Sequence, residues 1–325
     1  MTAQIASLLG VEPEEIIYTS GASESNNLAL KGIVQVSRHT GKHIISTALE
    51  HSSVGGALSA LQQQGCEMDL VDIGRDGRID LEHLRELLRR DTVLVSICAV
   101  DSELGTVQPI REIGKILRDY PNCRLHVDAT QAVGKTTLVL EVVDTMSIAP
   151  HKFYGLNGSG LLVKKKNLVI EPQIHGSSTT IYRSGTPALG LAVSIEKALE
   201  LALGNQAERI AYVRGLNRRL RTALAQYPAV RINSPETAVP HILNLSVSGV
   251  KGTAFQQELG KHGVCVSVKS ACSVEGTPSK AVYAVSHDRK NALSSWRISL
   301  SHLTTEAELE EFLQIFDRCY HDLTP

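Results

Sequence analysis

The sequence lacks any long block of charge, any long apolar run and any secretory leader pattern. Its 325 residues carry a formal net charge of −1, without the basic cluster that a nucleic-acid or membrane-surface protein uses. No apolar run approaches the roughly 20 residues that cross a bilayer. The opening residues, Met1 to Ser7, do not follow the basic-then-apolar order of a secretory signal. We therefore expect a protein without nucleic-acid or membrane partners.

Closely paired cysteines are also lacking. The chain has six scattered cysteines: Cys66, Cys98, Cys123, Cys265, Cys272 and Cys319. Their spacing matches neither a zinc site nor the disulfide framework of a small secreted domain. They indicate reduced thiols in a cytoplasmic protein that binds no metal.

Strand-like runs alternate with helix-like segments from residue 1 to about 205. Strands are expected at 15–19, 43–47, 67–71, 93–100, 124–127 and 145–148, and helices at 2–9, 24–36, 54–64, 81–88 and 109–117. Such alternation is typical of an α/β domain with a mostly parallel, doubly wound sheet. We assign this larger domain to residues 1–205.

The pattern changes after a long helical stretch at 190–226. Beyond it, strands are expected at 242–247, 264–268 and 296–300, and helices at 253–262 and 306–320. A chain of this length usually contains more than one hydrophobic core. We therefore expect a smaller α+β domain over residues 206–325.

Lys152 follows the apolar run that ends at Ile148, where Pro150 prevents an ordinary helix start. Phe153 and Tyr154 come next and could cover the lysine. Desolvation disfavours the charged form of a lysine and frees its lone pair for attack on a carbonyl. A lysine after a strand is more often simply solvated, so this stretch alone leaves both interpretations open.

Other polar residues follow expected strands and complement Lys152. The turn Ser20–Ser23 joins a strand to a helix start, which can bind phosphate. Asp128 ends the strand 124–127, and His51 follows the strand 43–47. Each could instead be an ordinary cap or surface residue. Together, a phosphate cradle, a strand-end aspartate and a Schiff-base lysine are the parts that pyridoxal phosphate needs, at the sheet edge where such folds bind ligands.

Eight stretches, in order along the chain, resemble the signatures of the cysteine desulfurases. These enzymes belong to the class V aminotransferase-like group (fold type I) of pyridoxal-phosphate enzymes. The stretches are Thr19–Asn27, Glu50–His51, Glu103–Pro109, His126–Lys135, His151–Gly155, Arg183–Thr186, Ser270–Ser273 and Trp296–Leu300. The resemblance covers essentially the whole chain and implies a fold type I enzyme with pyridoxal phosphate as its cofactor and L-cysteine as its substrate.

The resemblance implies roles for the residues around the cofactor ring. Lys152 would form the Schiff base and act as a base on the substrate. Asp128 would pair with the pyridine nitrogen, and Gln131 would reach the ring hydroxyl. His51 would stack on the ring and move protons.

The family pattern also supplies ligands for the phosphate and the substrate. Ala22, Ser23 and His151 would hold the phosphate, joined by Thr186 of the partner subunit, which implies a homodimer. Arg297 would bind the substrate carboxylate, a bidentate task suited to guanidinium.

Cys272 would define the reaction. Its neighbours Ser270, Ala271 and Ser273 indicate a polar loop rather than a core strand. An attacking thiol must be exposed and helped to deprotonate. By resemblance, Cys272 would take the sulfur of L-cysteine as a persulfide, release alanine, and pass the sulfur to an acceptor or scaffold protein for iron–sulfur clusters or thiolation.

The sequence departs from the family pattern in a few places. Ser102 stands at a cofactor-contacting position that is usually Asn, and Ala149 at one that is often Ser. The chain also begins later than family members, which carry a further N-terminal segment of roughly 50 residues. Two alternatives to a cysteine desulfurase therefore stay open: a selenocysteine lyase-like enzyme, and a non-catalytic paralogue that dimerises or binds sulfur-transfer partners.

Overall fold

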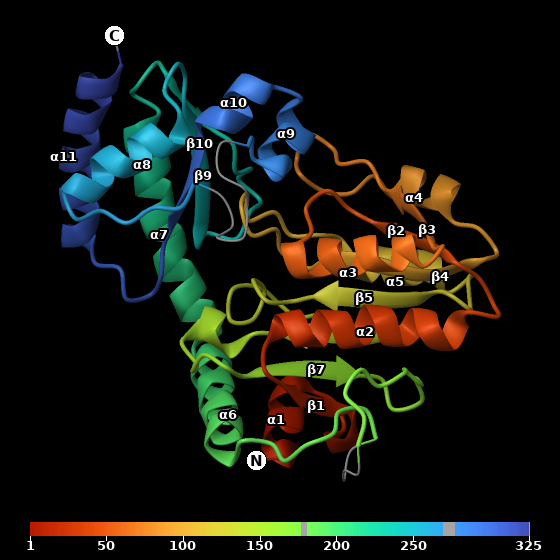
Figure 1. The fold of residues 1–325 in the computed structure, drawn as a ribbon. Coiled ribbons are helices and arrows are strands. Elements are labelled where there is room, and N and C mark those ends of the chain that lie inside the picture. Colours follow the sequence, from red (N-terminus) through yellow and green to blue (C-terminus); the bar gives the residue numbers. More distant parts are fainter. Residues whose placement is uncertain (177–180, 269–276, 325) are drawn as a thin grey trace. The chain divides into compact units, whose positions relative to one another are not determined.

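The computed structural model describes residues 1–176, 181–268 and 277–324, which form two compact units (Figure 1). Unit 1 comprises Met1–Asp72, Ile79–Val100 and Gln108–Asn205. Unit 2 comprises Ile73–Arg78, Asp101–Val107 and Gln206–Pro325. Two short segments from the first 205 residues thus belong to unit 2. In the described ranges, none of the helices combines the length and the apolar character that crossing a bilayer requires.

Unit 1 is built on a seven-stranded sheet, counted over the described residues, in the order β1-β7-β6-β5-β4-β2-β3. The strands are β1 Ile16–Thr19, β2 His43–Ser46, β3 Glu67–Leu70, β4 Thr92–Cys98, β5 Arg124–Asp128, β6 Thr145–Ile148 and β7 Gly160–Lys164. The pairs from β3 across to β6 are parallel, and β7 is antiparallel to both of its neighbours. The expected mostly parallel α/β sheet is confirmed.

The helices of unit 1 cover this sheet. They are α1 Thr2–Leu9, η1 Pro13–Glu15, α2 Ala22–Ser37, α3 Ser52–Gln63, α4 Leu81–Leu87, α5 Ile110–Leu117, η2 Pro150–Phe153 and α6 Leu189–Gly204. Helices α2 and α3 pack against each other (Figure 1), and α4 contacts α5. Right-handed crossovers place the first pair on one face and the second pair on the other. Apolar residues such as Leu28, Ile33 and Leu58 fill the core under α2 and α3.

The strand order gathers polar loops at one edge of the sheet. Because β7 is antiparallel to both β1 and β6, the edge strand β1 runs in the same direction as the parallel strands. The segments that follow the carboxyl ends of β1, β2, β5 and β6 are 20–23, 47–51, 129–131 and 149–152. These segments therefore share the edge at which open α/β sheets bind ligands.

Unit 2 is organised around an antiparallel sheet in the order β10-β9-β8. Its elements are β8 Val230–Ile232, β9 Ile242–Val247, β10 Ser295–Ser299, α7 Gln206–Leu224, α8 Gly252–Lys261, α9 Lys280–Ser286, α10 Arg289–Ser294 and α11 Glu306–Leu323. Trp296 stacks on Phe255 with ring centroids 5.1 Å apart, and Phe316 packs against both rings. This aromatic cluster forms the centre of the core of unit 2.

Two expected elements differ in the structure. The helical stretch 190–226 is broken at Asn205, where φ is −120°, because Gly204 and Asn205 are both poor helix formers. The strand expected at 264–268 is wrong: Ser267 makes only an isolated bridge to Arg297. Valines at 264, 266 and 268 pack partly buried against the core instead, which accounts for the alternating pattern in the sequence.

Candidate active site

The turn between β1 and α2 carries the residues predicted to bind phosphate. Ala22 opens α2 and Ser23 is exposed one position later, so both N–H groups precede the first intrahelical bond, from Ser25 N to Gly21 O at 3.1 Å. Gly160 on β7 approaches this turn so closely that a Cβ there would lie 2.6 Å from Gly21 Cα. The positive end of the helix dipole at this edge favours an anion.

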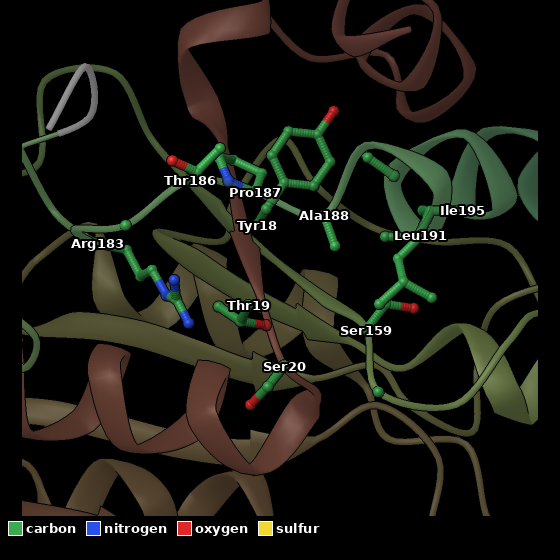
Figure 2. Close-up of a pocket in the computed structure, with 13 residues that line it drawn as sticks. Tyr18, Thr19, Ser20, Ser159, Arg183, Thr186, Pro187, Ala188, Leu191 and Ile195 are labelled. Carbon is green, nitrogen blue, oxygen red and sulfur yellow. The ribbon is translucent and has the colours of Figure 1, made fainter.

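Glu24 ties the same turn to the segment that carries Thr186. One carboxyl oxygen accepts from Ser20 N at 2.8 Å and the other accepts from Arg183 Nε at 2.9 Å. Burial raises the pKa of Glu24, but the hydrogen bonds from Arg183 and Ser20 outweigh burial and bring the pKa below its ordinary value. Ser20 and Thr186 both line a pocket of about 200 Å³ that α6 helps to close (Figure 2).

Asp128 is the last residue of β5 and is buried. Its Oδ1 accepts a hydrogen bond from Thr130 N at 2.9 Å, and its Oδ2 accepts one from Asn26 Nδ2 at 2.9 Å. Asn26 lies on α2 and is 0% exposed. The aspartate is therefore held rigidly in place from both the strand and the helix.

His51 is the N-cap of α3, where the sequence leaves β2 and turns into the helix. Its Nδ1 accepts from Ser53 N at 3.2 Å and lies 2.9 Å from Ser53 Oγ. Ser53 Oγ also accepts from Asn26 Nδ2 at 2.9 Å. Asn26 and Ser53 were not predicted as site residues from the sequence. A usable signal was that Asn26 lies four residues before Leu30, which places both on the same, buried face of the helix.

Gln131 follows Asp128 at the edge of the sheet and is partly buried. Its Oε1 accepts from Lys135 Nζ at 2.7 Å. With the carbonyl oxygen occupied in this way, the Nε2 amide is the end that can donate to a hydroxyl oxygen.

His151 and Lys152 lie in η2, directly after β6, and both are exposed. Burial of the ring lowers the pKa of His151, and the charge of Lys152 lowers it further. The predicted aromatic cover over Lys152 is wrong. Phe153 turns into the core at 4% exposure, whereas Tyr154 adopts a left-handed conformation and is 60% exposed.

Glu50, beside His51, is a buried carboxyl that the sequence resemblance gave no role. Its Oε1 accepts from Cys98 N at 2.8 Å and from Thr47 Oγ1 at 3.0 Å. Its Oε2 is buried without a hydrogen-bond partner in the described ranges. Burial raises the pKa of Glu50 to about 8. The nearby charge of Asp128 also raises this pKa, whereas the hydrogen bond from Cys98 N lowers it.

Unit 2 brings together two further predicted residues, Ser102 and Arg297. Arg297 Nη1 donates to the carbonyl of Ser102 at 2.6 Å, and Nη2 donates to Ser267 Oγ at 3.3 Å. Its Nε is buried and finds no acceptor among residues 1–176, 181–268 and 277–324. Next to Ser102, burial and the charge of Glu103 raise the pKa of Asp101 to about 7.

The structure thus separates the predicted residues into two sets. Unit 1 holds Ala22, Ser23, His51, Asp128, Gln131, His151, Lys152 and Thr186, and unit 2 holds Ser102 and Arg297. Cys272 lies outside the described residues. Over the part of the chain that the structure describes, no cluster of three or more His, Cys, Asp or Glu side chains is arranged to hold a metal ion.

Comparisons with known proteins match this geometry. The family model described as aminotransferase class-V matches residues 1–312. A NifS/IcsS protein homolog from Lactobacillus delbrueckii subsp. bulgaricus is 37% identical over 324 residues, which cover 98% of this chain and 84% of the relative. A cysteine desulfurase IscS from Dictyoglomus turgidum is 35% identical, with coverage of 98% and 82%.

A solved structure described as a NifS-like protein superposes with a TM-score of 0.93 at 31% identity and covers 99% of this chain and 87% of its own. A NifS-like protein from Rickettsia africae superposes with a TM-score of 0.87 at 29% identity, with coverage of 98% and 86%. The predicted fold type I architecture is confirmed by these likenesses. The chain belongs to the class-V aminotransferase family, within its cysteine desulfurase members of the NifS and IscS type.

Proposed function

We propose that the chain is a pyridoxal-phosphate-dependent cysteine desulfurase that converts L-cysteine to L-alanine and passes on the sulfur. The observation that carries the proposal is the single sheet edge shared by the 20–23 turn, the buried Asp128 and the lysine of η2. Relatives described as cysteine desulfurase IscS, at 35–38% identity over nearly the whole chain, support the same reaction.

The side chains of unit 1 fit pyridoxal phosphate. The N–H groups of Ala22 and Ser23 would take the phosphate at the start of α2, with His151 beside them. Gly160 keeps that turn against the sheet, because any larger residue would meet the backbone of Gly21.

The ring of the cofactor would be held by groups already fixed in place. Asp128 would pair with the ring nitrogen, and the Nε2 amide of Gln131 would donate to the ring hydroxyl. His51 would cover the ring, and the exposed Lys152 amine would hold the cofactor and move the α-proton of the substrate. When bound, the cofactor supplies an electron sink for the α-carbon.

Arg297 is proposed to bind the substrate carboxylate. The carbonyl of Ser102 and the hydroxyl of Ser267 already orient its guanidinium. Its Nε is buried and lacks an acceptor in the described ranges. A guanidinium held in this way is suited to bind a carboxylate. The backbone carbonyl of Ser102 performs this orientation, so the side chain at position 102 is not needed for it.

Cys272 is proposed to receive the sulfur. The C–S bond of L-cysteine breaks, the carbon keeps the electron pair and takes up a proton, and the sulfur becomes a persulfide on Cys272. An acceptor or scaffold protein would then take this sulfur for iron–sulfur clusters or thiolation. The proposal includes a homodimer, in which Thr186 of the partner subunit joins the phosphate site. It also includes a cytoplasmic location, in keeping with the five described cysteines, none of which forms a disulfide within the described ranges.

The test is to saturate the purified protein with pyridoxal phosphate, add L-cysteine and a reductant, and measure alanine and sulfide. Equal amounts of both products and a change in the visible cofactor band are expected. Protein that develops no cofactor band under saturation would refute the proposal. A band that L-cysteine leaves unchanged would favour the non-catalytic paralogue, and turnover confined to selenocysteine would favour the lyase-like enzyme.

Gly160→Ala is expected to weaken pyridoxal phosphate binding by at least about tenfold and to lower stability by roughly 1–3 kcal/mol, because the added methyl group overpacks against the cradle backbone. Cofactor titration and thermal unfolding measure the two effects. Gly55→Ala on α3 is the matched control, since its Cβ would meet nothing within 4 Å. Wild-type affinity in Gly160→Ala would contradict the placement of the phosphate at this turn.

A further inference from the structure

A continuous chain of hydrogen bonds joins Asp128 to His51. Asn26 Nδ2 donates to Asp128 Oδ2 and to Ser53 Oγ, at 2.9 Å in each case. Ser53 Oγ lies 2.9 Å from His51 Nδ1. Asp128 ends β5, Asn26 lies in α2, and Ser53 lies in α3, of which His51 is the N-cap. All three elements belong to unit 1 (Figure 1).

The orientation of the Asn26 amide is fixed by its neighbours. His126 Nε2 lies 3.0 Å from Asn26 Oδ1, and His126 Nδ1 lies 2.9 Å from Thr145 Oγ1. Burial lowers the pKa of His126 to about 4, although the charge of Asp128 opposes this, so the ring is neutral and carries one N–H. Turning the amide over would set its oxygen against the carboxyl of Asp128. The NH₂ group therefore faces Asp128 and Ser53.

The same chain selects one tautomer of His51. Ser53 N, which can only donate, lies 3.2 Å from His51 Nδ1, so this nitrogen is an acceptor. Ser53 Oγ already accepts from Asn26 and turns its own hydrogen toward the same Nδ1. In neutral His51 the ring hydrogen is consequently on Nε2.

We propose that Asn26 and Ser53 are positioning residues that hold neutral His51 with its hydrogen on Nε2 and couple the orientation of its ring to Asp128. The inference rests on the proposed function, in which His51 and Asp128 contact the same cofactor. Neutral His51 then presents an N–H at Nε2, so at this atom it donates a hydrogen bond to the group it faces and does not accept one. Asn26 and Ser53 thus join His51 and Asp128 in one hydrogen-bonded unit.

The test uses protein without cofactor, labelled with ¹⁵N-histidine, at about pH 8.5, where an ordinary imidazole is neutral. Ring ¹⁵N shifts distinguish a protonated nitrogen from an unprotonated one. We expect His51 to be protonated at Nε2 and bare at Nδ1. We also expect the Nδ1 resonance to shift in Ser53→Ala, which removes the hydroxyl donor, and in Asn26→Leu, which removes the group that orients this hydroxyl.

Ser52→Ala is the matched control, because Ser52 is an exposed serine in the same first turn of α3. Its His51 resonances should match those of the wild type, and Ser53→Thr, which keeps a hydroxyl, should restore the wild-type Nδ1 shift. The proposal is overturned if His51 of the wild type carries its hydrogen on Nδ1. It is also overturned if the Nδ1 resonance is the same in Ser53→Ala as in the wild type.

A second readout separates this inference from the proposed function. With cofactor bound, Ser53→Ala should lower kcat for alanine release roughly tenfold, the loss expected for one hydrogen bond, and leave cofactor affinity unchanged. If the wild type shows the Nε2–H tautomer but does not turn over L-cysteine, the positioning role stands and only the proposed reaction falls.

Discussion

Lys152→Ala is expected to lower the rate of alanine release from L-cysteine by roughly 10³-fold or more, because in the proposed function its amine would both hold the cofactor and move the substrate proton. The fold should survive the change. Lys152 is exposed, and the turns of η2 are closed by backbone bonds from Lys152 N to Ala149 O at 3.1 Å and from Gly155 N to Pro150 O at 2.9 Å. The thermal midpoint of the cofactor-free variant should therefore match that of the cofactor-free wild type.

Intact mass after borohydride reduction is the direct measurement for this variant. The wild type should gain the mass of one reduced cofactor per chain, whereas Lys152→Ala should gain none and should lose its cofactor on gel filtration. Lys115→Ala on α5 replaces another exposed lysine of unit 1 and should behave as the wild type. A Lys152→Ala protein that turns over L-cysteine at the wild-type rate would assign the Schiff base to a different residue.

Glu50→Gln is expected to stabilise the cofactor-free protein at neutral and alkaline pH. Burial raises the pKa of Glu50 to about 8 from its ordinary value of 4.5, so between these two pH values only the folded state holds the proton. Unfolding then releases a proton, and the stability of the wild type falls as pH rises through this window, by ~1.4 kcal/mol for each pH unit. Below about pH 4.5 both states are protonated, and the effect is absent.

The measurement is the thermal midpoint of both proteins from pH 5 to 8. The advantage of Glu50→Gln should grow with pH, while the contribution of Asp101, whose pKa is about 7, is present in both proteins and cancels in the difference. Glu112→Gln on the exposed side of α5 should leave the difference constant. A protonated carboxylic acid gives its own infrared band. If such a band is present at pH 7 in the wild type and absent in Glu50→Gln, the proton is on the carboxyl of Glu50. Parallel midpoint curves would show that Glu50 is ionised throughout.

Six of the seven strands described in unit 1 could be predicted because their signals are local, whereas β7 Gly160–Lys164 was not expected from the sequence. Apolar runs such as Thr145–Ile148 coincide with observed strands. The helix expected at 81–88 is also found, as α4, and Asp80 caps it by accepting from Glu82 N and His83 N. Prediction failed where one local pattern, an alternation of apolar residues, is compatible both with a strand and with an irregular segment that packs on the core. The alternating valines of 264–268 serve side-chain packing without a continuous strand partner.

The candidate site was predicted where chain order places a residue at a strand end, as for Asp128 and His51. What could not be predicted depends on burial between elements. Asn26 contacts Asp128 across 102 residues of sequence, and Glu50 reaches Cys98 N across 48. The exposure of Lys152 depends on which way Phe153 and Tyr154 turn, and their sequence alone does not determine this direction.

The position of β1 at the edge of the sheet has a consequence for synthesis. Among the strands that the structure describes, β1 pairs with β7 alone, and its last residue, Thr19, pairs with Gly160, 141 residues later in the chain. At a translation rate of about 5–20 residues per second, the ribosome needs roughly 7–30 s to supply that partner. During this interval Ile16 and Ile17 lack their native strand partner, and the turn at 20–23 has no β7 to pack against. The proposed phosphate site is therefore completed late, only after most of the sheet has been translated.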